Sequence, residues 1–425
     1  MTTIQVCGSV APVDAVVNVP GSKSVANRAL VCAALVPSGG RSRVTNVPGG
    51  DDCVAMLDAL RTVGALDGEV VTGGLLPGSG NSFDAGIAGT TSRFLTAASA
   101  LSPQGCTVDG GAPLRSRPMA DLHGALAALG AVVEPLGSAG HLPVRVARGS
   151  FDGGRVSVRG DVSSQFISAL MLVAPALGKG LVIDIDGPLV SRPYVEMTAA
   201  VMAAFGAEVA VDEATVSISP VPYVATEYHV EPDFSSAAFP LMSLAFTEGR
   251  VRIPGLARAV LQGDAKVLDI ARDMGIAVEV AGDDIVASRS GSNLRPVSVN
   301  LADASDLVPA VATACTVADG TSEITGVGFI RAKESDRLGD FAAEASHFGA
   351  SVEVLPDGLR IEGGVVTPTR SALSTHHDHR LAMAFALVAA GGVSVEICDP
   401  GVVAKSWPGY FEDMTPLLGE PRRVN

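Results

Sequence analysis

The sequence predicts an α/β protein built from six internal repeats of about seventy residues. The first observation is a polar, helix-starting cluster followed by a helix of small apolar residues, which occurs at 24–35, 91–101, 164–174, 236–245, 306–315 and 379–388. The starts of these segments lie 67, 73, 72, 70 and 73 residues apart. The second observation is a glycine between a helix and an alternating apolar strand, at Gly64, Gly130, Gly206, Gly275 and Gly349. A helix, a glycine and a strand recur in any α/β protein, but two markers that keep one period favour a true repeat.

Each repeat is expected to contain one inner helix, one more polar outer helix and several strands. The inner helices are apolar on every side, so they must be buried. Their N-termini carry unpaired N–H groups and a partial positive charge, which makes them available to anions. Glycine just after a helix favours a left-handed C-cap, and the V-x-V pattern that follows is typical of a half-buried strand.

Length and composition indicate a cytoplasmic protein of two domains. The 425 residues exceed the usual size of one domain. No apolar run approaches the roughly 20 residues that span a bilayer, and the N-terminus lacks the pattern of a secretion signal. The six cysteines are far apart with no C-x-x-C pair, which argues against a disulfide framework and a zinc cluster.

The charge distribution points to small anions as ligands. The net charge of −15 argues against nucleic acid and against an acidic membrane surface as the partner. The cations are 25 Arg and only 5 Lys. Three of these lysines, Lys23, Lys333 and Lys405, lie in glycine-rich or charge-rich segments. A lysine retained where arginine is the rule indicates that a compact ammonium is needed.

The first repeat opens with the segment Pro20–Arg28. A glycine turn precedes Lys23, Ser24 is a plausible N-cap, and Arg28 lies one turn inside the helix on the same face. A hydroxyl and two cations at a helix N-terminus make a good oxyanion cradle. The spacing is not that of a Walker A loop. Solvated cations at an ordinary cap are the alternative.

Four further motifs of the first half have the residues of a binding site. Gly89, within Ala88–Arg93, lets a ligand approach the backbone closely. The segment 114–118 places two arginines before a proline, and 161–166 offers two hydroxyls and an amide at a helix start. The segment 191–194 supplies a hydroxyl, a cation and an aromatic ring. Ordinary capping explains each motif alone, but their recurrence at equivalent points of successive repeats favours a site.

The second half carries candidate proton chemistry. Asp306 opens a buried helix, and Lys333 and Glu334 stand together in the charged run 331–337. Two more charged segments follow, at 377–380 and 404–408. Carboxylates separated by cations can supply one proton donor and one proton acceptor. Charges exposed to solvent are the alternative interpretation.

Nine motifs occur along the chain in the order PGSKSVANR, AGT, RP, VSSQF, SRPY, LQGD, KESDR, DHRLAMAF and AKSWPGYFE. In this order they resemble the 3-phosphoshikimate 1-carboxyvinyltransferase (EPSP synthase) family, over essentially the whole chain. The resemblance implies a two-domain inside-out α/β barrel, in which each domain has three βαβαββ repeats with buried helices and outer sheets. It implies one domain at 20–232, a second at 1–19 and 233–425, and an active site in the cleft between them.

The resemblance also implies the reaction. The enolpyruvyl group of phosphoenolpyruvate is transferred to the 5-hydroxyl of shikimate 3-phosphate, and phosphate is released on the route to chorismate and the aromatic amino acids. At the positions that match the family motifs, the resemblance implies that Asp306 accepts the hydroxyl proton, Glu334 donates a proton to carbon, and Lys23 bridges both ligands. His379 supports the site. Addition and elimination can reuse the same groups, so the assignment of each proton to one carboxylate stays open.

Ligand contacts follow from the same resemblance. Shikimate 3-phosphate is expected to contact Lys23, Ser24, Arg28, Ser163, Ser164, Gln165, Ser191, Tyr194, Asp306 and Lys333. Phosphoenolpyruvate is expected to contact Lys23, Gly89, Arg117, Gln165, Arg337, Arg380 and Lys405. No metal or organic cofactor is implied, and the histidines at 376, 377 and 379 match no usual zinc spacing. We expect a monomer that binds neither nucleic acid nor membrane.

Two positions depart from the family pattern. Ile87 stands where the family often has Asn, which removes a polar contact, and Phe329 stands where an Asn often precedes the Lys-Glu pair, which weakens a contact to shikimate 3-phosphate. Gly89 leaves room for glyphosate, an inhibitor of the family that occupies the phosphoenolpyruvate site, so sensitivity is expected. Ile87 and Phe94 alter that neighbourhood.

Three other functions fit parts of the sequence. UDP-N-acetylglucosamine enolpyruvyl transferases share the inside-out fold, but they usually carry a reactive Cys in a glycine loop, and Gly110–Pro113 has none. An RNA-end cyclase of related fold is disfavoured by the acidic charge. A non-catalytic sensor of phosphorylated metabolites would not need Asp306, Glu334 and Lys23 together.

Overall fold

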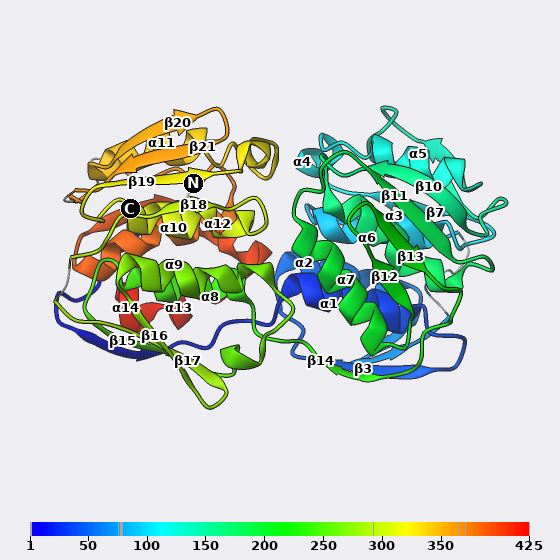
Figure 1. Cartoon of the computed structure of the whole chain (residues 1–425), viewed down its shortest axis with the longest axis horizontal. Helices are drawn as coiled ribbons and strands as arrows, with labels where there is room; N and C mark the ends of the chain where they lie inside the picture. The colour runs from blue at the N-terminus through cyan, green and yellow to red at the C-terminus, as the bar shows by residue number, and fades with distance from the viewer. Residues whose placement is uncertain are drawn as a thin grey trace. The chain divides into compact units, whose positions relative to one another are not determined.

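The chain divides into two units, seen in the computed structural model drawn in Figure 1. Unit 1 consists of Met1–Pro20 and Glu231–Asn425, and unit 2 of Gly21–Val230. The structure describes residues 2–74, 76, 80–291, 293–364, 366–369 and 371–424. Because the first twenty residues belong with the second half of the chain, unit 2 is continuous in sequence and unit 1 is not.

The described residues of unit 2 form three four-stranded sheets with one shared pattern. Their strand orders are β14-β3-β5-β4, β6-β7-β9-β8 and β10-β11-β13-β12. In each sheet the first two strands are parallel and the other neighbours antiparallel. The strands are β3 (Arg41–Thr45), β4 (Leu66–Asp67), β5 (Val70–Thr72), β6 (Ser82–Asp84), β7 (Cys106–Asp109), β8 (Val132–Pro135), β9 (Val144–Ala147), β10 (Gly154–Arg159), β11 (Leu181–Asp186), β12 (Val209–Val211), β13 (Thr215–Ile218) and β14 (Glu227–His229). The last strand of the unit, β14, thus completes the first sheet.

The helices of unit 2 separate into inner and outer sets. The inner helices are α1 (Lys23–Ala34), α3 (Gly89–Ser99) and α6 (Ser164–Val173), which contact one another and are almost wholly buried. The others are α2 (Asp51–Thr62), α4 (Ala112–Arg115), α5 (Ala120–Ala128), α7 (Arg192–Ala204) and the 3₁₀ helix η1 (Ala174–Ala176). Chain order in the second and third repeats is β-α-β-α-β-β, apart from the short α4 and η1, as predicted.

Unit 1 repeats this plan twice and then departs from it. Two four-stranded sheets have the orders β16-β17-β15-β2 and β18-β19-β21-β20, and a three-stranded sheet has the order β22-β1-β23. The strands are β1 (Thr3–Val6), β2 (Val13–Val16), β15 (Gly249–Ile253), β16 (Ala277–Ala281), β17 (Asp284–Arg289), β18 (Ser298–Asn300), β19 (Thr321–Thr325), β20 (Ser351–Leu355), β21 (Gly358–Glu362), β22 (Val395–Cys398) and β23 (Arg422–Val424). In the sixth repeat a single parallel bridge, Leu373 to Ile397, stands where the other repeats have a parallel strand. Pro368, which precedes it, has no N–H to donate to a ladder.

The inner helices of unit 1 are α8 (Phe234–Ser243), α10 (Val308–Cys315) and α12 (His379–Ala386), and every residue of the three is buried. The other helices are α9 (Val267–Met274), α11 (Gly339–Ala345), α13 (Tyr410–Asp413) and α14 (Thr415–Leu418), with the 3₁₀ helices η2 (Leu256–Arg258), η3 (Gly263–Lys266), η4 (Ser305–Leu307), η5 (Gly328–Ala332), η6 (Ser346–Phe348), η7 (Leu387–Gly391) and η8 (Pro400–Lys405). The six predicted buried helices are therefore confirmed. Among the described residues, none of the helices has the length and hydropathy to cross a bilayer.

The ends of the helices agree with the sequence at the glycines and differ from it at the start of α1. Gly64, Gly130, Gly206, Gly275 and Gly349 all have positive φ, between 70° and 99°, which confirms the predicted left-handed helix ends. The predicted N-cap at Ser24 is wrong. The helix α1 begins at Lys23, and the extended residue before it is Ser22. The hydroxyl of Ser24 therefore lies in the first turn.

His123 of α5 makes stability depend on pH. The residue is only 6% exposed, and burial, followed by the charge of His141, lowers the pKa of His123 to about 4. Between pH 6.5 and 4 the unfolded chain therefore binds a proton that the folded chain does not, so stability falls as pH falls through this window. The full shift corresponds to at most about 3 kcal/mol.

We expect His123→Leu to remove this loss. Denaturant unfolding of the wild type and the variant at pH 7.5 and pH 4.5 measures it. The two proteins should differ more at pH 4.5 than at pH 7.5, in favour of the variant. His229→Leu, at an exposed histidine of the same unit, is the control and should leave the pH dependence unchanged. An equal effect of both substitutions contradicts the prediction.

Candidate active site

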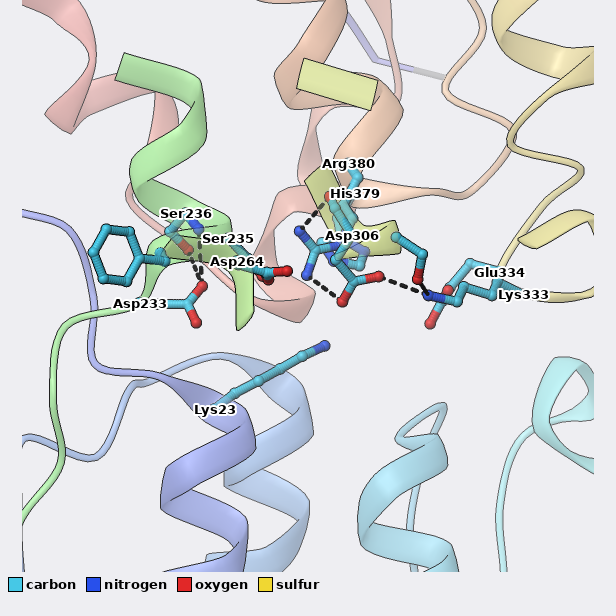
Figure 2. Close-up of polar contacts among 12 residues, drawn as sticks. Lys23, Asp233, Ser235, Ser236, Asp264, Asp306, Lys333, Glu334, His379 and Arg380 are labelled. Carbon is cyan, nitrogen blue, oxygen red and sulfur yellow. Dashed lines mark hydrogen bonds and ion pairs between the residues drawn. The ribbon is translucent and has the colours of Figure 1, made fainter. Parts of the chain in front are cut away.

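Asp306 is the centre of a charged cluster in unit 1, on η4 at the start of α10 (Figure 2). Its Oδ1 accepts hydrogen bonds from Lys333 Nζ at 2.8 Å and Arg337 Nη1 at 3.0 Å, and its Oδ2 accepts one from Arg380 Nη2 at 2.9 Å. Burial alone raises the pKa of Asp306, but Arg380, Lys333 and Arg337 outweigh it and hold the pKa well below its usual value. The group is therefore a carboxylate with three cations around it.

Arg337 joins three carboxylates. Its side chain is 1% exposed and donates to Asp306, to Glu334 Oε2 at 2.9 Å and to Asp378 Oδ2 at 2.7 Å. Burial lowers the pKa of Arg337, but Asp378, Glu334 and Asp306 raise it above its ordinary value, so the guanidinium stays charged. The buried ammonium of Lys405 lies 3.3 Å from Glu334 Oε1. Glu334 thus stands between two cations.

Lys333 has neighbours of three kinds. Besides Asp306, its ammonium donates to Ser305 Oγ at 2.9 Å. Burial lowers the pKa of Lys333, and Asp306 only partly restores it. The ring of Phe329 lies 5.7 Å from Nζ, so the residue that departs from the family pattern supports the ammonium by a cation–π contact.

The start of α12 holds the third segment of the cluster. Asp378 is its N-cap and accepts from the backbone N–H of Arg380 at 2.9 Å while it also binds Arg337. His379, the first residue of the helix, is buried, with Nδ1 3.7 Å from Asp378 Oδ1. Asp378 was not among the predicted site residues, although an Asp before a helix is the usual signal of an N-cap.

Asp264 is a second carboxylate that was not among the predicted site residues. It lies on η3, is buried, and accepts a hydrogen bond from Ser235 Oγ at the start of α8. Burial, followed by the charge of Asp306, raises the pKa of Asp264 to about 7. The pKa values of Asp264 and Asp306 are thus displaced in opposite directions. Asp264 belongs to the motif LQGD, to which the sequence alone assigned no role.

Unit 2 contributes a second group of the predicted residues. Lys23, the first residue of α1, has its ammonium 2.6 Å from Asp52 Oδ2 on α2. At the first residue of α3, a Cβ added to Gly89 would lie 2.5 Å from Arg93 Nη1 and 2.8 Å from Arg117 Nη1. Two guanidinium groups therefore lie against the backbone of Gly89. Arg93 was not among the predicted ligands.

Arg28 is buried rather than open to solvent. Its guanidinium donates to Thr198 Oγ1 at 2.7 Å, to Ser168 Oγ at 3.2 Å and to the carbonyl of Ser24 at 2.7 Å. It also lies 5.9 Å from the ring centre of Tyr194. Burial lowers the pKa of Arg28 to about 10. Arg28, Ser24 and Tyr194 thus form one polar group.

The remaining predicted ligands stand at two helix starts. Ser163 is the N-cap of α6 and accepts from the backbone N–H of Gln165 at 3.3 Å, with Ser164 between them. Ser191 is the N-cap of α7 and has a left-handed backbone, φ 56°. Arg192, the cation of its motif, pairs with Glu196 at 2.9 Å on α7.

The three neighbouring histidines point to different partners. His376 contacts Glu344, His377 is 79% exposed, and His379 is buried. Within the described part of the chain, there is no group of three or more His, Cys, Asp or Glu side chains that could hold a metal ion.

Known proteins resemble this chain over nearly its full length. The family model described as EPSP synthase (3-phosphoshikimate 1-carboxyvinyltransferase) matches residues 8–414. The 3-phosphoshikimate 1-carboxyvinyltransferase of Methanothermobacter thermautotrophicus is 40% identical over 408 residues, which are 94% of this chain and 95% of the relative. That of Edwardsiella ictaluri is 38% identical over 414 residues, with coverage of 94% and 95%. The structure of EPSP synthase from Acinetobacter baumannii superposes with a TM-score of 0.80 at 24% identity, covers 100% of both chains, and shows the shared fold.

Proposed function

The chain belongs to the EPSP synthase family, and on this premise we propose which of its residues carry out the family's reaction. The protein transfers the enolpyruvyl group of phosphoenolpyruvate to the 5-hydroxyl of shikimate 3-phosphate, giving 5-enolpyruvylshikimate 3-phosphate and phosphate. This is a step of the shikimate pathway towards chorismate and the aromatic amino acids. The observation that carries the site proposal is the Asp306 carboxylate held by Lys333, Arg337 and Arg380.

We propose that Asp306 and Glu334 handle the two protons. In the addition, the 5-oxygen bonds to C2 of phosphoenolpyruvate, its proton passes to Asp306, and C3 receives a proton from Glu334. In the elimination, the bond from C2 to the phosphate oxygen breaks and C3 loses a proton, which restores the double bond. The resemblance leaves open which carboxylate accepts this last proton. Two separate carboxylates allow one donor and one acceptor to act in the same step.

The cations around the carboxylates explain how they become reactive. Arg337, Arg380 and Lys405 are proposed ligands of phosphoenolpyruvate, and they pair with Asp306 and Glu334 in the structure. An anionic substrate that binds these cations shares their charge. The Asp306 carboxylate then loses part of the attraction that holds its pKa low, so the pKa of Asp306 rises. Substrate binding thereby raises the affinity of Asp306 for the proton of the 5-hydroxyl.

Ligands from both units complete the proposal. For shikimate 3-phosphate we propose Lys23, Ser24, Arg28, Ser163, Ser164, Gln165, Ser191, Tyr194, Asp306 and Lys333. For phosphoenolpyruvate we propose Lys23, Gly89, Arg117, Gln165, Arg337, Arg380 and Lys405. Hydrogen bonds between cations and phosphate or carboxylate are the strong ones in such a site. We also propose that the protein is cytoplasmic and that it is a monomer; light scattering of the purified protein tests the oligomeric state.

An assay of phosphate release tests the function. Phosphoenolpyruvate is supplied with shikimate 3-phosphate in one reaction and with UDP-N-acetylglucosamine in another. We expect release of inorganic phosphate only in the first reaction. Release with UDP-N-acetylglucosamine would assign the other acceptor, and binding of shikimate 3-phosphate without any turnover would indicate a sensor.

Gly89→Ala should weaken phosphoenolpyruvate binding while the fold remains. The new methyl group meets the flexible ends of Arg93 and Arg117, which can move away without a backbone shift. Displacing one charge-assisted hydrogen bond to the substrate raises KM for phosphoenolpyruvate by about 10- to 100-fold. Steady-state kinetics at saturating shikimate 3-phosphate measures this.

Gly124→Ala is the matched control for this substitution. Gly124 lies in α5 of the same unit, and nothing lies within 4 Å of an added Cβ. An unchanged KM for phosphoenolpyruvate in Gly89→Ala would remove Gly89 from the proposed site.

A further inference from the structure

The turn before α12 has an unfavourable backbone. His376 and His377 are consecutive residues other than glycine with left-handed conformations, φ 49° and 58°. Such a conformation costs about 1–2 kcal/mol for each L-residue with a Cβ. The turn leads directly into Asp378, His379 and Arg380, which are part of the charged cluster. Neighbouring contacts must therefore stabilise it.

A buried carboxylate on α11 supplies these contacts. Glu344 Oε1 lies 2.8 Å from His376 Nε2, and Glu344 Oε2 accepts from the backbone N–H of Ser374 at 3.0 Å. Because a carboxylate only accepts, the imidazole donates through Nε2. Asp340, one turn earlier on α11, has Oδ1 3.5 Å from His376 Nδ1. The ring of His376 is thus held between two carboxylates of one helix.

Helix α11 also follows directly after the segment that carries Glu334 and Arg337. The helix α11 begins at Gly339, two residues after Arg337. Two contacts therefore connect the segment of Glu334 and Arg337 to the segment of Asp378 and Arg380. They meet within the cluster through the 2.7 Å bond from Arg337 to Asp378, and outside it through Glu344 and His376.

His377 provides a contrast within the same turn. It has the same residue type and the same left-handed backbone, but its side chain is 79% exposed and its Nδ1 lies 3.6 Å from Asp399 Oδ2 at the surface. Screening by water makes such an exposed pair worth little. Of the two histidines, only His376 has its ring held by a buried carboxylate.

We propose that His376 is a positioning residue for the reaction. Through its bond to Glu344 it holds the turn in the left-handed conformation that sets Asp378 against Arg337 and Arg380 against Asp306. The proposal rests on the site proposed above, in which Arg337 and Arg380 bind phosphoenolpyruvate. Loss of the bond lets the turn relax and moves Arg380 away from the position that the substrate requires.

Kinetics of His376→Ala tests the proposal. We expect KM for phosphoenolpyruvate to rise by roughly 10- to 100-fold, because a small displacement of a positioned group has effects of this size. KM for shikimate 3-phosphate should stay within about twofold, because most of its proposed ligands lie in unit 2. A merely structural role would lower the melting temperature and the active fraction and leave KM unchanged. His377→Ala is the matched control, with both KM values expected within twofold of wild type.

Substitutions of Glu344 keep the test decisive if His376→Ala folds poorly. Glu344→Ala should reproduce the rise in KM for phosphoenolpyruvate, and Glu344→Gln, which keeps one oxygen acceptor, should show an intermediate rise. The double variant His376→Ala with Glu344→Ala should be no worse than either single variant, because both remove the same bond.

Two results distinguish a wrong role for His376 from a wrong assignment of the site. Arg380→Met is the reference, and an unchanged KM for phosphoenolpyruvate in this variant overturns the site assignment. If Arg380→Met raises that KM while His376→Ala leaves it within twofold, the positioning role of His376 is wrong. An equal rise in His377→Ala also overturns it, since the exposed ring cannot act through Glu344.

Discussion

Replacing Asp306 with Asn is expected to lower kcat by about 10²- to 10⁴-fold, the usual contribution of a positioned acid or base. The amide keeps an oxygen that can accept from the surrounding cations, so the fold should be retained. It cannot take the proton of the 5-hydroxyl. The phosphate-release assay at saturating concentrations of both substrates measures the loss.

The control for this prediction lies in the same segment. Asp303→Asn changes an exposed carboxylate three residues earlier and should leave kcat within about twofold. A fall in kcat of less than tenfold in Asp306→Asn, with unchanged circular dichroism, would show that another group accepts the proton. Asp264, whose pKa lies near neutrality, would then be the first candidate.

Arg337→Met is expected to destabilise unit 1 by about 3–5 kcal/mol, the cost of removing one partner of a buried ion pair. Asp306, Glu334 and Asp378 would lose their shared cation, and Asp378 is wholly buried. Differential scanning calorimetry should show a fall in the unfolding temperature on the order of 10 °C. Arg337→Lys should be intermediate, because an ammonium keeps the charge but does not have three separate donor nitrogens.

Arg360→Met is the control for this loss. Arg360 also lies near two carboxylates of unit 1, Glu353 at 2.7 Å and Glu323 at 3.6 Å, but its side chain is 43% exposed. Removal of an exposed pair costs at most about 1 kcal/mol. Similar losses in the two variants would mean that burial of the Arg337 cluster does not determine its contribution.

The inner helices could be predicted from the sequence because the apolar composition of each segment is enough to indicate that it is buried. A run such as 306–315 has almost no polar side chain after its first residue, so it can only be buried. The glycine helix ends were predicted for the same reason, since a left-handed cap is a local requirement. Helix starts were less accurate, because both Ser22 and Ser24 are acceptable caps and the backbone selects Ser22.

Residues whose role depends on distant partners were missed. Asp264 acquires its raised pKa from burial and from Asp306, 42 residues away, and Asp378 is tied to Arg337, 41 residues away. Arg93 became a candidate ligand only because the fold places its guanidinium beside that of Arg117, against Gly89. No local pattern reports such contacts. The ion pair of Arg192 could be predicted locally, because Glu196 follows four residues later on the same helix.

The place of β1 between β22 and β23 has a consequence for synthesis on the ribosome. Residues 21–230 can fold as soon as they emerge, because all three sheets of unit 2 are formed from that stretch. The strand at residues 3–6 has no partner until residues 395–398 are translated, roughly 20–80 s after its own synthesis at about 5–20 residues per second, and its second partner at residues 422–424 follows. A nascent chain halted near residue 390 should therefore carry a protease-resistant middle and an N-terminal tail that is still digestible.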